Sequence, residues 1–203
     1  MAERVANGNV ALALLANSIA TGAALVALIL TLGPISGAHL NPLVTLADAM
    51  EGGLAWAETP PYICAQVLGA VIGAIAAHIM FGLPLVSLSH HNRSGPAQIF
   101  SEFIATFGLV SVIWGCSRLR PSVLPFAVPA YIAAAYWFTA STSFANPAVT
   151  VGRSLSDTFS GIRPTDVPGF ILAQLAGGAA ATFLFRWLVP SPPSCAKDMV
   201  FLD

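Results

Sequence analysis

The spacing of the charged residues constrains this chain more than any other feature of its sequence. Only 8% of the 203 residues are Asp, Glu, Lys or Arg, and long stretches between them carry no charge. A helix crosses the hydrocarbon core of a bilayer with about 20 mostly apolar residues. Stretches of this length predict five membrane-spanning helices, at residues 10–32, 60–82, 99–116, 124–142 and 168–189.

Composition and motifs exclude several other classes of protein. The apolar stretches are continuous rather than alternating, which favours helices over a transmembrane β-barrel. The chain has 8 Lys and Arg residues, too few for a surface that binds nucleic acid. Its 3 cysteines are too scattered for a disulfide framework or a metal site. Because no nucleophile is paired with a base, we expect neither an enzyme nor a metal or cofactor; the expected partner is the lipid bilayer.

Two segments that contain Asn-Pro interrupt the apolar pattern, at residues 36–45 and 143–150. Asn41 of the first aligns with Asn146 of the second, and the apolar spans that follow the two segments also align. Internal repeats with interrupted hydrophobic segments at matching places point to a binding or conduction site near the membrane midplane.

The orientation follows from the loop at residues 117–123, which contains Arg118 and Arg120 and no acidic residue. The positive-inside rule places this loop in the cytoplasm. Counting spans from there makes the first Asn-Pro segment enter the membrane from inside and the second from outside. The repeat is therefore expected to be inverted, and the tail at 190–203 to be cytoplasmic.

The two repeats are unequal in length. We expect one channel domain over residues 1–203, with a first repeat at about 8–82 and a second at about 99–189. The second repeat begins with a span that contains Glu102, and the counterpart of this span would precede residue 1. We therefore expect that a first helix is missing, through truncation or a misassigned start codon.

Each Asn-Pro pair is typical of a helix start. Asn is among the best N-cap residues, and Pro is tolerated at the first helical position because no partner is needed there for its missing N–H. Short helices at about 41–50 and 146–156 would bring two N-termini, each with a partial positive charge, to the bilayer centre. That charge repels cations and protons. The Asn amides and the nearby backbone carbonyls then suit small neutral molecules with hydroxyl groups.

These segments resemble the major intrinsic protein family, the aquaporins and glycerol facilitators, over residues 8 to about 190. The resemblance is carried by residues 35–45, by Asn-Pro-Ala at 146–148 and by the span with Glu102. It implies an all-α membrane protein with an inverted repeat, having five of the usual six full helices here and two re-entrant half-helices. It also implies a homotetramer with a pore in each protomer, in a bacterial inner membrane.

The resemblance assigns roles to particular residues. The central constriction would consist of Asn41, Pro42, Leu43, Asn146, Pro147 and Ala148. The loops whose carbonyls line the pore would contribute Gly37, Ala38, His39, Leu40, Phe144 and Ala145. Glu102 would be a support that accepts backbone N–H groups from the first re-entrant loop.

The outer selectivity filter departs from the usual pattern of the family, which has an aromatic residue and an arginine there. The corresponding positions are Thr21, Ala134, Ser143 and Val149. Without the ring and the arginine, the filter is expected to be wide. This set is similar to that of a bacterial subgroup associated with arsenic resistance, thought to pass arsenite and methylated arsenicals.

Arg153 lies one helical turn after Val149 and could reach back into the outer vestibule. The alternatives are that it extends to the interface or pairs with Asp157. Asp48 is the repeat counterpart of Arg153, with the same ambiguity. The external loop that contains Arg93 is expected to be solvated.

We thus predict a channel for passive passage of water, glycerol-like polyols and metalloid hydroxides such as arsenite through a filter without arginine. Two alternatives stay open. One is a secondary transporter with an inverted repeat, which would couple flux to an ion. The other is a truncated family member that does not conduct.

Overall fold

The computed structural model describes residues 1–189, and the regular secondary structure of this part of the chain is helical. The predicted cytoplasmic tail at 190–203 lies outside the described residues. The helices are α1 (Ala2–Val5), α2 (Val10–Ser36), α3 (Pro42–Met50), α4 (Thr59–Met80), α5 (Pro96–Leu119), α6 (Leu124–Phe138), α7 (Pro147–Ser154) and α8 (Val167–Leu188), with short 3-10 turns at Pro121–Val123 and Pro164–Asp166.

Five helical segments of the described part are long and apolar enough to cross a membrane: α2, α4, α5, and α6 and α8 each together with the 3-10 turn that precedes it. This confirms the predicted fold class, an all-α multi-pass membrane protein. Several predicted boundaries differ by a few residues: α2 continues to Ser36 instead of ending at residue 32, and α6 ends at Phe138 instead of continuing to residue 142. The chain leaves the helix there to form the loop that leads to α7.

Helices α3 and α7 are the two predicted half-helices, and each begins at an Asn-Pro pair. The Oδ1 atom of Asn41 accepts a hydrogen bond from the N–H of Leu43 at 3.0 Å. Asn146 accepts from the N–H of Ala148 at the same distance, 3.0 Å. The side chain of each Asn thus satisfies a free N–H of the first turn.

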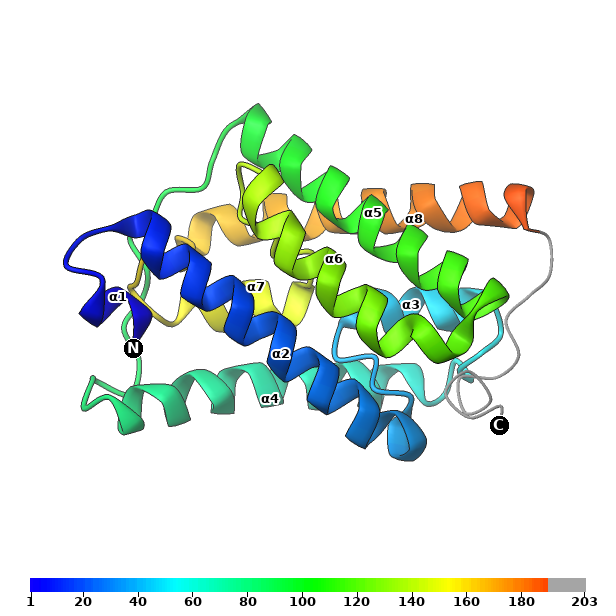
Figure 1. The fold of residues 1–203 in the computed structure, drawn as a ribbon, viewed down its shortest axis with the longest axis horizontal. Helices are drawn as coiled ribbons and strands as arrows, with labels where there is room; N and C mark the ends of the chain where they lie inside the picture. The colour runs from blue at the N-terminus through cyan, green and yellow to red at the C-terminus, as the bar shows by residue number, and fades with distance from the viewer. Residues whose placement is uncertain (190–203) are drawn as a thin grey trace.

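The long helices surround the two half-helices. Helix α2 packs against α6, α5 against α8, and α4 against α7 (Figure 1). Helix α3 packs against α4, α8 and α7, and α4 runs along the lower edge of the view in Figure 1. This arrangement brings the N-termini of α3 and α7 to the middle of the molecule.

The contact between α5 and α8 depends on a glycine. A Cβ atom at Gly177 would collide with the backbone oxygen of Phe103 and would lie 3.0 Å from the backbone nitrogen of Phe107. Further along, the buried indole of Trp114 donates to Oγ1 of Thr182 at 3.1 Å. Small residues let membrane helices approach closely, and here they allow the two backbones to touch.

An ion cluster fixes the C-terminal end of α3, at the predicted cytoplasmic side. Glu51 accepts from Arg118 of α5 at 2.9 Å and also pairs with Arg186 of α8. Arg186 in addition donates to the backbone oxygen of Met50 at 2.8 Å. The half-helix is therefore held at one end by its cap and at the other by charges from two long helices.

Candidate solute pore

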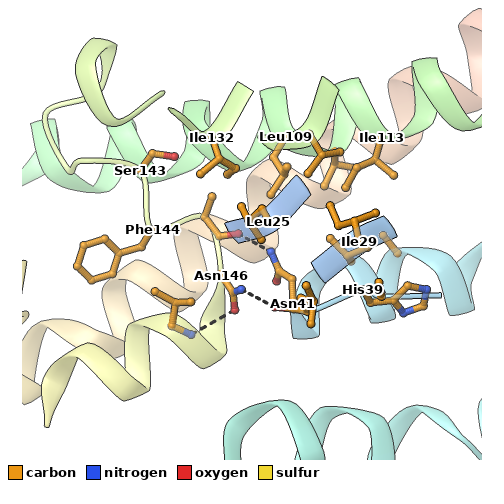
Figure 2. Close-up of a pocket in the computed structure, with 18 of the residues that line it drawn as sticks. Leu25, Ile29, His39, Asn41, Leu109, Ile113, Ile132, Ser143, Phe144 and Asn146 are labelled. Atoms are coloured by element: carbon orange, nitrogen blue, oxygen red, sulfur yellow. Dashed lines mark hydrogen bonds between the residues drawn. The ribbon is translucent and has the colours of Figure 1, made fainter. Parts of the chain in front are cut away.

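The two capping asparagines meet at the centre of the molecule and each donates to the opposite loop. Nδ2 of Asn41 donates to the backbone oxygen of Ala145 at 2.8 Å. Nδ2 of Asn146 donates to the backbone oxygen of Leu40, also at 2.8 Å. Figure 2 shows the two amides side by side with these bonds dashed. An amide nitrogen has two hydrogens, so each Asn keeps a second donor for a solute.

The loops before the two Asn residues share an unusual backbone. Ala38 and Leu40 have φ angles of 45° and 50°, and their repeat counterparts Ser143 and Ala145 both have φ of 48°. The left-handed region costs an L-residue roughly 1–2 kcal/mol. The repeat therefore reproduces a strained conformation at equivalent positions, and strain of this kind persists only where surrounding contacts enforce it.

Glu102 supplies such contacts to one of the loops. Its fully buried carboxylate accepts from the N–H of Phe144 at 2.8 Å and of Ala145 at 2.9 Å. Gln174 of α8 donates to the same carboxylate at 2.6 Å. Our expectation that Glu102 braces the first re-entrant loop is therefore corrected: it braces the second, because α5 packs against α8 beside that loop.

A cavity of about 420 Å³ extends along the paired asparagines. Figure 2 shows apolar side chains facing the amides from the other side, among them Leu25, Leu109 and Ile132. Most of the predicted pore residues line this cavity: Thr21, Gly37, Ala38, His39, Leu40, Asn41, Ser143, Phe144, Ala145, Asn146, Val149 and Arg153.

Four residues predicted at the central constriction do not line the cavity, namely Pro42, Leu43, Pro147 and Ala148. They follow the capping asparagines, and the first turn of each half-helix faces its neighbours. Leu43 is 3% exposed and points at Gly178 of α8, where a Cβ would lie 2.7 Å from its Cδ2. The leucine is accommodated because Gly178 has no side chain.

The structure corrects the composition of the outer filter. Ala134 is exposed and does not line the cavity. Tyr136 lines it instead and is 3% exposed, with its hydroxyl 3.3 Å from Oγ1 of Thr21. An aromatic ring is thus present at this level. Its signal in the sequence was the four-residue spacing of Val128, Ile132 and Tyr136, which places them on one face of α6.

Arg153 provides a positive charge at the same level. Its Nη2 donates to the Tyr136 hydroxyl at 2.7 Å, and its Cζ lies 4.3 Å from the ring centre of Phe144. Its Nη1 is buried and has no hydrogen-bond partner among residues 1–189. Arg153 does not pair with Asp157, which instead accepts from the N–H of His90 at 2.9 Å. Position 149 is not an arginine, but Arg153 places a guanidinium group in the cavity wall.

Arg93 is a further residue that sequence reasoning misjudged. It is 4% exposed rather than solvated, and its side chain donates to the backbone oxygens of Gly161, Ser141 and Phe159. Burial lowers the pKa of Arg93 to about 10, so it stays charged at neutral pH. It ties the external loops together behind the outer mouth.

Comparison with known proteins identifies the family. The model of the major intrinsic protein family matches residues 2–122. Aquaglyceroporin AqpS of Rhizobium meliloti (strain 1021) is 54% identical over 184 residues, 90% of this chain and 79% of its own length. The chain belongs to the major intrinsic protein family.

More distant members of the family match as well. The probable aquaporin AqpM of Archaeoglobus fulgidus is 32% identical over 180 residues, 81% of this chain and 72% of the relative. The glycerol uptake facilitator protein of Bacillus subtilis (strain 168) is 34% identical over 147 residues, 63% of this chain and 52% of the relative. The family resemblance inferred from the two Asn-Pro segments is confirmed.

Proposed function

We propose that this member of the major intrinsic protein family is a passive channel for small neutral solutes that bear hydroxyl groups, including water and glycerol-like polyols. The cavity along the paired amides of Asn41 and Asn146 carries the proposal. The N-termini of α3 and α7 add partial positive charge there, which disfavours cations. The names of the relatives, an aquaglyceroporin and a glycerol uptake facilitator, support the same solute class.

The outer filter supports a second solute class, neutral metalloid hydroxides such as arsenite, As(OH)₃. Val149 presents an apolar surface where an arginine would narrow the path. Arg153 contributes donors from one helical turn further along α7, and its Nη1 has no hydrogen-bond partner within the described part of the chain. Such a filter combines width with hydrogen-bond donors, which suits a bulky neutral hydroxide.

Stopped-flow light scattering on proteoliposomes tests the proposal, with water, glycerol and arsenite as permeants. We expect permeability to all three above that of empty liposomes, with no dependence on a proton or sodium gradient. Water flux without arsenite flux would contradict only the proposed passage of metalloid hydroxides. The absence of any flux would overturn the channel and leave the non-conducting alternative.

A matched pair of substitutions on α2 ties flux to this cavity. Leu25 lines the cavity, whereas Leu28, on the same helix, is 44% exposed. We expect Leu25→Trp to lower glycerol permeability by about ten-fold because a bulky ring obstructs the path. Leu28→Trp, facing lipid, should stay near the wild-type value. Equal permeabilities of the two variants would show that solutes take another route.

The secondary-transporter alternative depends on a carboxylate available for ion coupling. Glu102, the intramembrane residue considered for that role, is fully occupied by two backbone N–H groups and Gln174. Flux driven against a solute gradient by an ion gradient would nevertheless restore this alternative.

We also propose a homotetramer in a bacterial inner membrane, with the pore inside each protomer. Helix α4 supports lateral association, since Leu68 and Ile72 are 60% and 63% exposed on its surface. Crosslinking in native membranes should give species up to the tetramer; only monomers would contradict this assembly.

A further inference from the structure

The inverted repeat places two opposite charges at equivalent positions. Asp48 of α3 and Arg153 of α7 occupy matching places after their capping asparagines. Both line the same cavity. Because the repeat is inverted, they lie on opposite sides of the paired asparagine amides. Arg153 presents hydrogen-bond donors to the cavity, whereas Asp48 presents acceptors.

The carboxylate of Asp48 has no bonding partner of its own. Asp48 is 2% exposed, and neither of its Oδ atoms has a hydrogen-bond partner among residues 1–189. The neighbouring arginines do not neutralise it, because Arg118 and Arg186 both pair with Glu51. A buried carboxylate without donors is unfavourable, so its place on a cavity wall points to a donor that comes from the cavity.

The ring of His39 lies beside this carboxylate, and the hydroxyl of Thr45 next to it bears on which ring nitrogen carries the hydrogen. Oγ1 of Thr45 donates its one hydrogen to the backbone oxygen of Asn41 and accepts from Gln66. With the Thr45 hydroxyl in this orientation, Nδ1 of His39, 3.1 Å from that Oγ1, carries the hydrogen of the neutral ring. Nε2 of His39 is then a bare acceptor.

Two acceptors thus face each other with no donor between them. Nε2 of His39 lies 3.6 Å from Oδ2 of Asp48, and neither atom has a hydrogen-bond partner in the described chain. This separation is too long for a direct hydrogen bond. A group that supplies two hydroxyl hydrogens would satisfy both atoms.

We propose that Asp48 and His39 form an acceptor-type solute site for neutral molecules with two or more hydroxyl groups, on the predicted cytoplasmic side of the paired asparagines. This inference rests on the proposed channel function and adds a second site to it. A polyol then meets donors at Arg153 on one side and acceptors at Asp48 on the other. Arg153 can donate to the oxygen of a hydroxyl group, and Asp48 can accept the hydrogen of a hydroxyl group.

Glycerol and water permeabilities of the Asp48→Asn variant test the site. Asparagine keeps the size of the side chain but removes the charge and one acceptor. We expect glycerol permeability to fall about five-fold, because hydrogen bonds to charged groups are the stronger ones, and water permeability to change by less than about two-fold. The exposed Glu58, at the same end of the molecule, supplies the control: Glu58→Gln removes one negative charge and should leave both values unchanged.

A second variant guards against a folding defect. His39→Leu removes the Nε2 acceptor and should lower the glycerol-to-water permeability ratio in the same direction. If Asp48→Asn does not yield folded protein, the ratio measured for His39→Leu decides. An unchanged ratio in the folded variants would overturn the site while the channel stands, and an equal loss of water and glycerol would overturn its preference for polyols. A wild-type protein that passes neither solute would overturn the channel itself.

Discussion

The two halves of the molecule build the same loop but brace it differently. In the second half, Glu102 holds the N–H groups of Phe144 and Ala145. In the first half, no carboxylate of residues 1–189 accepts from the equivalent N–H groups of His39 and Leu40. Both loops nevertheless have the same left-handed residues. The local sequence around Asn-Pro sets the conformation, whereas its support depends on which long helix lies behind it.

The helices behind the loops show the same contrast. Gly177 of α8 lies against the backbone of α5, whereas a Cβ on Gly69 or Gly73 of α4 would meet nothing within 4 Å. Gln174 donates to both Glu102 and Thr150, whereas its counterpart Gln66 donates to Thr45, the counterpart of Thr150, and to no carboxylate of the described residues. Equivalent sequence therefore yields a closed interface in one half and an open one in the other.

Removing the brace of the second half should have the largest effect. Glu102→Ala leaves two buried N–H groups without an acceptor and removes one of the two acceptors of Gln174, which we expect to cost about 3–5 kcal/mol in the free energy of unfolding. Unfolding in mixed micelles, followed by circular dichroism, measures the loss. Gln66→Ala is the control in the first half and should cost much less, since that side chain braces no carboxylate. Equal losses in the free energy of unfolding for Glu102→Ala and Gln66→Ala would contradict the proposal that the two loops are braced differently.

The capping asparagines and the half-helices could be predicted from sequence because the signals are local. Asn41 and Asn146 cap the helices that directly follow them, and each Pro stands where its missing N–H is harmless. The five spans followed from the charge-free gaps for the same reason. These features need no knowledge of distant contacts.

The errors concern features that distant segments decide. Glu102 was assigned to the wrong loop because its partner depends on how α5 packs. The family resemblance assigns Ala134 to the filter, whereas the packing of α6 turns Ala134 outwards and places Tyr136 on the cavity wall. Leu43 belongs to the core only because residue 178 is a glycine on another helix. Arg93 is held by carbonyls of the two loops that precede and follow α7.

Adding a methyl group to the helix contacts should have an intermediate effect. Gly177→Ala forces α8 away from the α5 backbone and should destabilise the protein by about 1–3 kcal/mol. Gly69→Ala adds the same methyl group to an open surface and should be neutral or slightly stabilising, since alanine favours helices. Thermal unfolding of the two purified variants compares them directly. A larger loss for Gly69→Ala would mean that α4 is covered more tightly than α8.

The smallest effect on stability is expected for a change at Val149, in the wall of the outer pore. Val149 is the repeat counterpart of Val44. Val149→Arg adds a second guanidinium beside Arg153 and narrows the path. We expect arsenite and glycerol permeabilities to fall by about five-fold and water permeability by less, with little change in stability. Proteoliposome flux provides the measurement. Unchanged arsenite uptake would count against a filter at this level.

The ion cluster at Glu51 sets an order for assembly in the membrane. Glu51 lies directly after α3, near the start of the chain, but its partner Arg186 is 135 positions later, on the last long helix. At a synthesis rate of roughly 5–20 residues per second, the ribosome needs on the order of ten seconds to make the chain between them. The first half-helix must therefore wait in the bilayer for that long before its clamp can close. The Asn41 bond to Ala145 imposes a similar delay, so the centre of the channel is completed only after the second Asn-Pro segment has been made.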